Sequence, residues 1–524
     1  MAAGIRSSLL RHPLAFLAAI FLLAGQFVLS AGEIRVRVLH TSDLHGALEA
    51  RPEEGESGLL RVATRLRQAY AEAPEGHALL LDTGDTFQGS LASGLDNGKP
   101  MLAWLEALPY DTWTPGNHDF DFGYDAFLEA AQRLQGKILC GNLHALEETG
   151  ERDYPSWRLF TFGDAKIAVI GATASYMPNW FLDFPEHFRV ESLRAMLRRI
   201  MPEVLASEPH AIILAVHQGW MEQDARGVNE LKGLPREFPE IDLVLGGHTH
   251  RAFPGRTIGV NTWYEQPASD GKYFGQIDLW IDPAERRVTH LESRLVETPA
   301  ETPEDPAAKA ALSPWLVRAE SLSREVIAPA LPKALTAKGR PGVDCAASEL
   351  FCQAISEATG AELALHGVLV REEIPGGIPL TRRELHTLVP YENTIVVCQV
   401  TAEELQQILE EQWALRKHSS YSGLYGVEAI MDREGHCQIL SIAGESPVSN
   451  KRYSLALNSH EAAGSGRTPA LRRILDDPES QTRDTKISTR QAALQWFRNH
   501  PGELPRIQTW LQVPGNSRKK TVNP

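Results

Sequence analysis

The first half of the sequence alternates short strand-like runs with stretches whose apolar residues recur at helical spacing. The runs read "IRVRVL", "HALLL", "KIAVIG", "AIILAV" and "IDLVLG", and between the first two lies "LLRVATRLRQAY" at residues 59–70. Apolar runs of this length are typical of strands buried on both faces, and the intervening spacing indicates amphipathic helices. This alternation constrains the fold most strongly, and it predicts an α/β architecture with helices covering mixed sheets.

The chain is too long for one hydrophobic core. It has 524 residues, which favours two domains. The stretch "TPAETPEDP" is rich in proline and acidic residues and is typical of a domain boundary. We therefore expect a signal peptide at 1–31, a first domain at 33–298, a linker with a helix broken at Pro314 at 299–327, a second domain at 328–513 and a disordered tail at 514–524.

The N-terminus has the pattern of a secretory signal peptide. Arg6 and Arg11 precede an apolar stretch that ends in small residues. The alternative is an uncleaved membrane anchor, but the apolar run from Leu14 to Leu29 is short for a membrane span. We expect cleavage, a periplasmic or secreted location and no stable membrane insertion afterwards.

Charge and cysteine content narrow the possible partners. The formal net charge is −15, which argues against nucleic acid as a general surface partner. The five cysteines show no CxxC spacing. We predict no specific disulfide, and interpret the cysteines as buried free thiols.

Five turns in the first domain carry metal-binding or proton-transferring side chains directly after a strand-like run. In open α/β sheets, ligands bind beyond the carboxyl ends of the strands, so we expect these turns to meet. The candidates are Asp43 and His45 in "TSDLHG", Asp85 in "GDTFQG", Asn117, His118 and Asp121 in "GNHDFDFG", His217 in "HQG", and His248 and His250 in "GGHTH".

These residue types suit two divalent ions that share one carboxylate. We interpret Asp85 as the shared ligand. One ion would take Asp43, His45 and His250, and the other Asn117, His217 and His248. Such a set accepts Zn, Mn, Fe or Co. The two carboxylates of this ligand set do not cancel the charge of two divalent ions. The remaining positive charge attracts a phosphate, and the ions lower the pKa of a bound water that acts as the nucleophile.

The same turn supplies a proton donor. His118 follows a predicted ligand directly, and Asp121 lies three residues further on, where a carboxylate can orient the imidazole. We predict that His118 protonates the leaving alkoxide. Asp119 is interpreted as a helix-start or solvent-exposed residue without a role in the chemistry.

The five motifs resemble those of the calcineurin-like metallophosphoesterases. The form "GNHDFDFG" and the second domain resemble the exported bacterial 5'-nucleotidases, UDP-sugar hydrolases and 2',3'-cyclic nucleotide phosphodiesterases. The resemblance implies a four-layer αββα domain followed by a smaller α/β domain. It also implies a dinuclear site with the ligand roles given above and His118 and Asp121 as the catalytic pair.

In the second domain the resemblance is looser. The segment "LVREEIPGGIPLTRRELHTLVPYENTIVV" resembles the family stretch with a substrate-binding arginine and a stacking aromatic, which places these roles on Arg371 and Tyr391. A second aromatic usually follows "LN" and precedes "GGDG". Here Ser459 or His460 stands near the aromatic position, and Ser465 replaces the aspartate.

The sequence therefore predicts an exported metal-dependent phosphoester hydrolase with a small-molecule substrate, most simply a 5'-nucleotidase. One alternative keeps the chemistry and changes the substrate to a UDP-sugar, a 2',3'-cyclic nucleotide or another phosphomonoester. An alternative of a different class is a non-catalytic exported binding protein that keeps its metals for structure.

Overall fold

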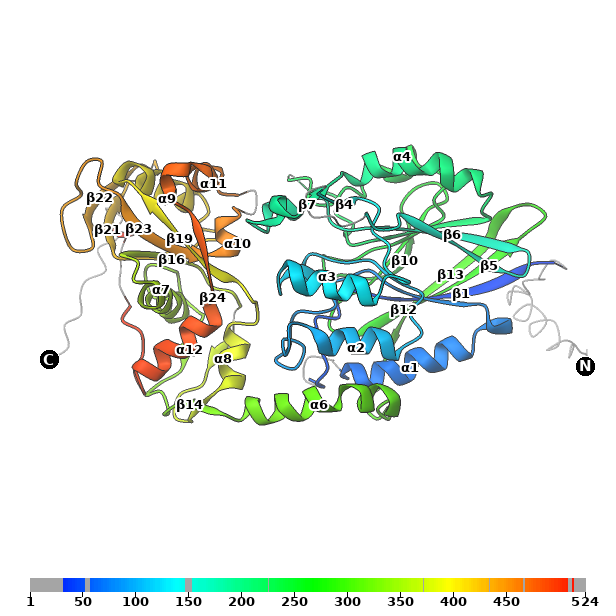
Figure 1. The fold of residues 1–524 in the computed structure, drawn as a ribbon, viewed down its shortest axis with the longest axis horizontal. Helices are drawn as coiled ribbons and strands as arrows, with labels where there is room; N and C mark the ends of the chain where they lie inside the picture. Colours follow the sequence, from blue (N-terminus) through cyan, green and yellow to red (C-terminus); the bar gives the residue numbers. More distant parts are fainter. Residues whose placement is uncertain are drawn as a thin grey trace, which may run out of the picture.

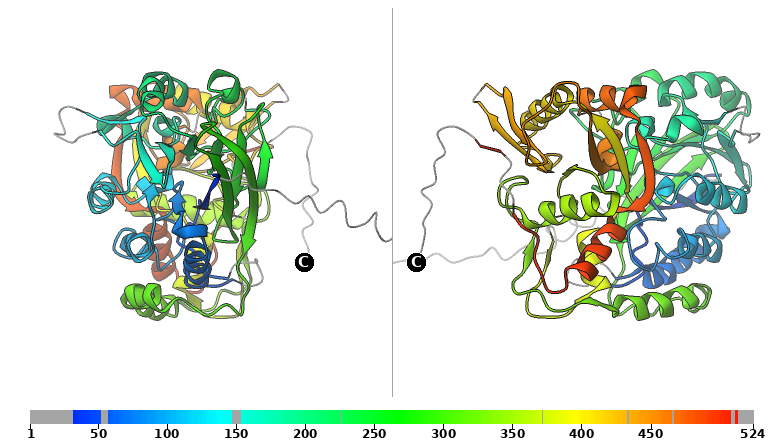
Figure 2. Two further views of the ribbon diagram at one scale, coloured as in Figure 1. Left: turned by 90° about the vertical axis from the view of Figure 1, so that its right-hand side faces the viewer. Right: turned by 60° about the vertical axis from the view of Figure 1, so that its left-hand side comes forward.

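The computed structural model describes residues 32–51, 57–146, 153–224, 226–370, 372–432, 434–464, 467–507 and 511–512 (Figure 1). The expected signal peptide at 1–31 and the expected tail at 514–524 lie outside the described residues. The chain forms two α/β domains, and Figure 2 shows them from two further sides.

The first domain contains two mixed sheets. One has the order β13 (Arg287–Glu297), β12 (Tyr273–Asp282), β1 (Ile34–Thr41), β2 (Ala78–Asp82), β3 (Thr112–Trp113). The other has the order β10 (Ala252–Thr257), β11 (Trp263–Pro267), β9 (Leu243–Leu245), β8 (Ala211–Val216), β6 (Ala165–Ala172), β5 (Trp157–Phe162). Strands β1, β2 and β3 run parallel, as do β6, β8, β9 and β11, so within each sheet their carboxyl ends lie along one edge.

The two sheets pack face to face with helices outside them. Val38 and Leu81 of one sheet share a buried cluster with Val169 and Ile213 of the other. The outer helices are α1 (Leu59–Ala71), α2 (Lys99–Ala107) and α3 (Tyr124–Arg133) on the first sheet, and α4 (Leu193–Ala206) and α5 (Leu234–Glu237) on the second. The predicted αββα order is confirmed.

Helix α6 (Pro306–Ser323) joins the two domains along one side of the molecule (Figure 1). The expected break at Pro314 is wrong, since the helix runs through this residue. Asp305 caps its start by accepting a hydrogen bond from the Ala308 amide at 2.7 Å. Leu312 is fully buried in the core formed with α1, α2 and α3, and this packing offsets the backbone hydrogen bond that an internal proline removes.

The second domain is built on the sheet β20 (Gly423–Tyr425), β16 (Leu363–His366), β23 (Tyr453–Asn458), β19 (Thr394–Val400), β24 (Arg483–Ser488). Helices α7 (Ala346–Thr359) and α12 (Thr489–Asn499) cover one face, and α9 (Ala402–Ala414) and α11 (Pro469–Asp476) the other. A smaller sheet contains β22 (Cys437–Ile442), β21 (Val427–Met431) and β25 (Leu511–Gln512). The predicted capping box of Thr401 and Glu404 starts α9, which confirms that prediction.

Short elements complete the fold. They are the strand pairs β4 (Leu143–Ala145) with β7 (Phe188–Val190), β14 (Val326–Ala328) with β18 (Leu380–Thr381), and β15 (Leu335–Thr336) with β17 (Glu373–Ile374), and the helices α8 (Arg382–Leu388) and α10 (Ser459–Ala462). All five cysteines are free and buried, as predicted. Among the described residues, no helix is both long and apolar enough to cross a bilayer.

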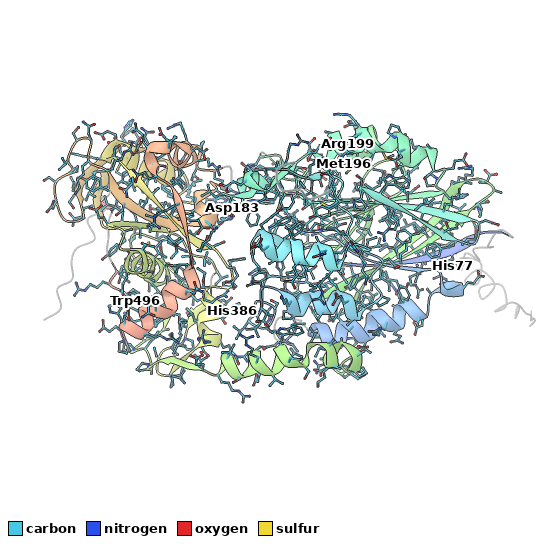
Figure 3. The ribbon with its side chains drawn as sticks, viewed as in Figure 1. His77, Asp183, Met196, Arg199, His386 and Trp496 are labelled. Atoms are coloured by element: carbon cyan, nitrogen blue, oxygen red, sulfur yellow. The ribbon has the colours of Figure 1, made fainter. Side chains whose placement is uncertain are left out.

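The two domains touch near the ends of the first-domain strands. Leu182 of the first domain packs against the second-domain core around α9 and β23. Asp183, labelled in Figure 3 where the first domain approaches the second, lies 3.9 Å from Lys486 Nζ. The Gln88 side-chain amide donates to the Pro390 carbonyl at 2.6 Å. These contacts place second-domain residues directly over the predicted site.

Candidate metal centre and catalytic pair

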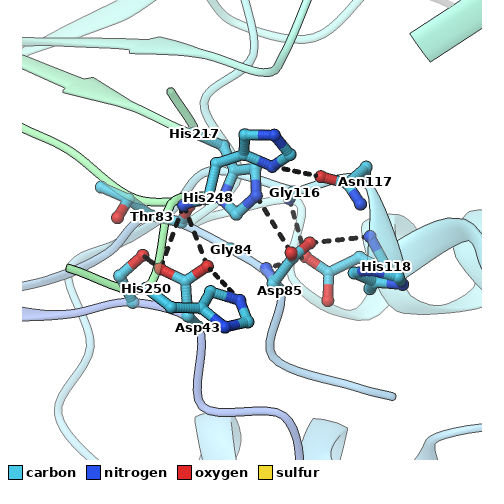
Figure 4. Close-up of polar contacts among 12 residues, drawn as sticks. Asp43, Thr83, Gly84, Asp85, Gly116, Asn117, His118, His217, His248 and His250 are labelled. Atoms are coloured by element: carbon cyan, nitrogen blue, oxygen red, sulfur yellow. Dashed lines mark hydrogen bonds and ion pairs between the residues drawn. The ribbon is translucent and has the colours of Figure 1, made fainter. Parts of the chain in front are cut away.

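All seven predicted metal ligands converge at the carboxyl ends of β1, β2, β3, β8 and β9. Figure 4 labels all of them except His45. The first cluster contains Asp43, His45, Asp85 and His250, whose candidate ligand atoms all lie within 4.8 Å of one another. His45 Nε2 is 3.0 Å from His250 Nε2, and His250 Nε2 is 3.4 Å from Asp43 Oδ1. The four side chains therefore point at one shared space.

The second cluster shares Asp85 with the first. The ligand atoms of Asp85, His217 and His248 also lie within 4.8 Å of one another. His217 Nε2 is 3.1 Å from Asp85 Oδ2, and Asn117 Oδ1 is 2.9 Å from His248 Nδ1. The structure thus brings together the two sets that the sequence predicts, with Asp85 between them.

Two of the histidines are oriented by backbone carbonyls. His217 Nδ1–H donates to the Thr83 carbonyl at 2.6 Å, and His45 Nδ1–H donates to the Gln88 carbonyl at 3.1 Å. A histidine whose Nδ1 carries the proton keeps the lone pair of Nε2 for a metal ion. Both Nε2 atoms face Asp85, which is the orientation that a bound ion requires.

The electrostatics of the cluster also fit divalent cations. Burial raises the pKa of Asp43 to about 7, so its negative charge is costly without a nearby positive charge. Burial lowers the pKa of His248 to about 3 and that of His250 to about 4, which keeps both rings in the neutral form that binds metals. Carboxylate, imidazole and amide donors in a buried site suit divalent ions.

Much of this geometry depends on unusual backbone. Five predicted ligands have left-handed φ angles: Asp43 (51°), His45 (44°), Asp85 (54°), His248 (69°) and His250 (54°). Left-handed backbone is uncommon outside glycine, and strained residues cluster at functional sites. The residue before Asn117 is Gly116, and only a glycine fits there, because an added Cβ would lie 2.3 Å from Asp85 Oδ1.

His118 and Asp121 form the predicted pair. His118 Nδ1–H donates to Asp121 Oδ2 at 2.8 Å, and the His118 amide donates to Asp85 Oδ1 at 2.7 Å. Burial opposes charge on the ring, but the carboxylates of Asp121 and Asp85 outweigh it and raise the pKa of His118 to about 10. In the absence of metal ions the ring therefore carries a proton at neutral pH. Its Nε2 remains available for proton transfer.

Asp119 lies in the first turn of the short 3-10 helix His118–Phe120, which confirms the helix-start alternative, but it is not the solvent-exposed residue of the other alternative. It is only 2% exposed. Its carboxylate accepts hydrogen bonds from the amides of Asp85, Thr86, Phe87 and Gly116, at 2.8 to 3.0 Å. Asp119 therefore ties the Asp85 turn to the Asn117 turn. The sequence offered one signal for this role, an additional acid inside a motif that already had its ligand and its proton donor.

The second-domain predictions have a mixed outcome. Tyr391 lies over the site and stacks on His118, with 5.7 Å between ring centroids and 23° between planes. Arg371 lies outside the described residues, as does Ser465. His460 and Tyr391 line a cavity of about 310 Å³ that reaches His118 and is otherwise formed by the second domain.

The fold and the site together define a metal-dependent phosphoester hydrolase. Residues 36–252 match the family model of the calcineurin-like phosphoesterases. Residues 326–473 match the model of the 5'-nucleotidase C-terminal domain. The chain therefore carries a calcineurin-like phosphoesterase domain followed by a 5'-nucleotidase C-terminal domain, and the resemblance inferred from the motifs is confirmed.

Known proteins resemble the chain over most of its length. The protein UshA of Escherichia coli is 25% identical over 487 residues, covering 83% of this chain and 87% of that protein. A 5'-nucleotidase of Vibrio vulnificus is 24% identical over 485 residues, covering 83% and 86%. The structure of a 5'-nucleotidase precursor from Thermus thermophilus has a TM-score of 0.69 at 19% identity, covering 92% of this chain and 99% of that one, which shows the shared fold.

Proposed function

We propose that this protein is an exported 5'-nucleotidase that uses two divalent ions to release phosphate from nucleotides. The observation that carries the proposal is the pair of ligand clusters sharing Asp85, with His118 directly beside them. In this proposal one ion is held by Asp43, His45, Asp85 and His250, and the other by Asp85, Asn117, His217 and His248. The ions are Zn, Mn, Fe or Co, and when bound they supply Lewis-acid activation of the phosphate and of a water nucleophile.

The protein's own residues supply the proton. Asp121 accepts from His118 Nδ1–H and fixes the ring, so that Nε2 carries the proton that the leaving alkoxide needs. The backbone hydrogen bond from His118 to Asp85 holds the ring beside the metal clusters. When His118 Nε2 donates its proton, the oxygen of the leaving alcohol does not accumulate negative charge as its bond to phosphorus breaks.

The second domain holds the rest of the substrate in this proposal, through Tyr391 and Arg371. Tyr391 offers a ring on which a base can stack. The ring centroids of Tyr391 and His118 are 5.7 Å apart. A base stacked between the two rings would need about 7 Å, which is one contact distance on each of its faces. The second domain must therefore shift when a base enters between the two rings.

The division of the chain follows from these roles. We place the catalytic domain at 33–298, the linker at 299–327 and the substrate-binding domain at 328–513, after a cleaved signal peptide at 1–31. The proposed location is the periplasm or the exterior. A second candidate substrate is another phosphoester, including a UDP-sugar or a 2',3'-cyclic nucleotide, because Tyr391 is the one tyrosine, phenylalanine or tryptophan among the described residues that line the cavity.

A substrate panel tests the proposal. Residues 32–524, loaded with Mn or Zn, are assayed with AMP, UDP-glucose, 2',3'-cyclic AMP and 4-nitrophenyl phosphate, with metal-stripped protein as the control. We expect AMP to have the highest kcat/KM and the stripped protein to be inactive. Hydrolysis of 4-nitrophenyl phosphate with poor activity on every nucleotide would refute the nucleotidase assignment and retain the phosphoester hydrolase. Equal activity with and without metal would refute both.

A further inference from the structure

A buried histidine and a buried glutamate join the two sheets of the first domain close to the metal clusters. His40 lies near the end of β1 in one sheet, and Glu265 lies in β11 of the other. Both side chains are fully buried, and His40 Nδ1–H donates to Glu265 Oε2. Neither residue belongs to the ligand clusters or to the proton-donating pair, so the chemistry described so far does not use them.

Stability alone is a weak reason for such a pair. Taking a carboxylate out of water costs free energy, and apolar side chains in place of a buried ion pair are often as stable or more stable. None of the described residues offers a hydrogen bond to Glu265 Oε1, so the carboxylate is only partly satisfied. Gly275 of β12 leaves space for it, because an added Cβ would lie 2.5 Å from Oε1. A costly pair with its own space in the sheet indicates a role beyond packing.

The other ring nitrogen of His40 reaches the turn that carries the shared ligand. His40 Nε2 is hydrogen-bonded to the Thr83 hydroxyl at 2.9 Å. Thr83 precedes Asp85 by two residues, and its carbonyl accepts the Nδ1–H of His217 at 2.6 Å. The second bond leaves His217 Nε2 free for a metal ion. His40 therefore holds the residue whose carbonyl orients His217.

The Thr83 hydroxyl also reaches the turn of a further ligand. It donates to the Gly246 carbonyl at 3.4 Å, and the Gly246 amide donates to the Glu265 carbonyl at 2.9 Å. Gly246 precedes His248 by two residues, and His248 belongs with His217 to the second ligand cluster. The buried pair is thus connected to the turns of both histidines of the second cluster.

We propose that His40 and Glu265 are positioning residues for the metal ion of the second cluster, and that they act through Thr83. The hydrogen bonds from Glu265 through His40 to Thr83 fix the carbonyl that orients His217 and support the turn that carries His248. Side chains that hold metal ligands from behind in this way set their orientation and raise metal affinity. This inference rests on the proposed function, because that function assigns an ion to the second cluster.

The test measures metal binding in variants of Thr83. Thr83→Val removes the hydroxyl and keeps the shape and the backbone carbonyl, whereas Thr83→Ser keeps the hydroxyl. Binding of Mn²⁺ to the metal-stripped protein is followed by equilibrium dialysis, and we expect two ions per wild-type chain. Thr83→Val should weaken one ion by about tenfold to a hundredfold and leave the other nearly unchanged, and Thr83→Ser should restore the affinity. The loss should not add to that of His217→Ala, because both act on the same ligand.

Two further variants separate positioning from stability. His40→Leu combined with Glu265→Leu removes both polar side chains together; it should weaken the same ion, without adding to the effect of Thr83→Val. Asp278→Asn is the matched control, since Asp278 of β12 pairs with Arg37 of β1, with 3.0 Å between Arg37 Nε and Asp278 Oδ1. We expect this control to lower the unfolding temperature and to leave the affinities of both ions unchanged.

Failure of the positioning role and failure of the proposed function give different results. Unchanged binding in Thr83→Val, or equal weakening of both ions, would overturn the positioning role and leave the two-ion centre intact. A loss in Thr83→Val that the double leucine variant does not share would overturn the part assigned to His40 and Glu265. If the wild-type chain binds fewer than two ions, the proposed two-ion function itself is wrong.

Discussion

The predicted metal centre and the second-domain cavity differ in how their side chains are held. In the first domain Asp43, Asp85 and His217 are buried, follow directly on strands and bond to neighbouring backbone or side chains. In the second domain the cavity wall consists largely of loops and helix ends around Gly367, Ser420 and Thr468. The rigid framework of the first domain holds the metal ligands in place. The loops around the second-domain cavity can differ in sequence, and so alter the substrate preference, without moving those ligands.

The largest effect is expected from the residue that both ligand clusters share. Asp85→Asn removes the central negative charge and should abolish both metal binding and hydrolysis of every substrate. Metal content by mass spectrometry and kcat on AMP check this together. Retention of metal and activity by a folded Asp85→Asn protein would contradict the shared-ligand assignment.

The rigidity of the first domain has its own test at Asp119. Replacement by alanine leaves four buried backbone N–H groups without their acceptor and should destabilise the protein by about 3 kcal/mol. Thermal unfolding measures the loss. Asp125→Ala, at an exposed position in the first turn of α3, is the matched control and should change stability little. Equal stability of the two variants would show that Asp119 does not hold the turns together.

A smaller effect, confined to some substrates, is expected in the second domain. Tyr391→Ala should lower kcat/KM for AMP by about tenfold to a hundredfold, the usual worth of base stacking. It should affect glycerol 1-phosphate much less, because that substrate has no ring. Tyr391→Phe keeps the ring and is the control. An equal loss on both substrates would mean that Tyr391 acts on the chemistry through His118.

The smallest effect is a pH dependence in the second domain. His386 of α8, labelled in Figure 3, is 8% exposed, and burial together with Arg490 and Arg383 lowers its pKa to about 3. The unfolded chain takes up a proton near pH 6.5 and the folded one does not, so stability falls as pH decreases below 6.5. Between pH 7 and pH 5 this loss is about 2 kcal/mol.

Denaturant unfolding at the two pH values measures this loss. His386→Leu should remove most of the His386 contribution. His436→Gln changes an exposed histidine and should leave the difference nearly unaltered. An undiminished loss in His386→Leu would assign the pH dependence to other groups.

Local strand and helix patterns predicted mixed sheets covered by helices and the meeting of the seven ligand residues at strand ends, whereas the αββα order was implied by the resemblance of the five motifs to a known family. The sequence placed Asp119 at a helix start correctly but missed its buried contacts, which depend on two turns that come together only in the folded domain. It also expected a break at Pro314, where packing of α6 preserves the helix. The left-handed backbone of residues such as Asp43 and His248 could not be predicted, since neither is glycine. The cavity lined by Tyr391 and His460 combines segments distant in sequence, so its shape could not be predicted, although the family resemblance had singled out both residues.

The central claim is that the first domain performs the chemistry, with His118 as proton donor. It is tested most directly by the leaving-group dependence of His118→Ala. With AMP, whose leaving alkoxide is strongly basic, kcat should fall by about 10²- to 10⁴-fold. With 4-nitrophenyl phosphate, whose leaving group needs no proton, kcat should fall far less. An equal fall on both substrates, or no fall on AMP, would contradict the account.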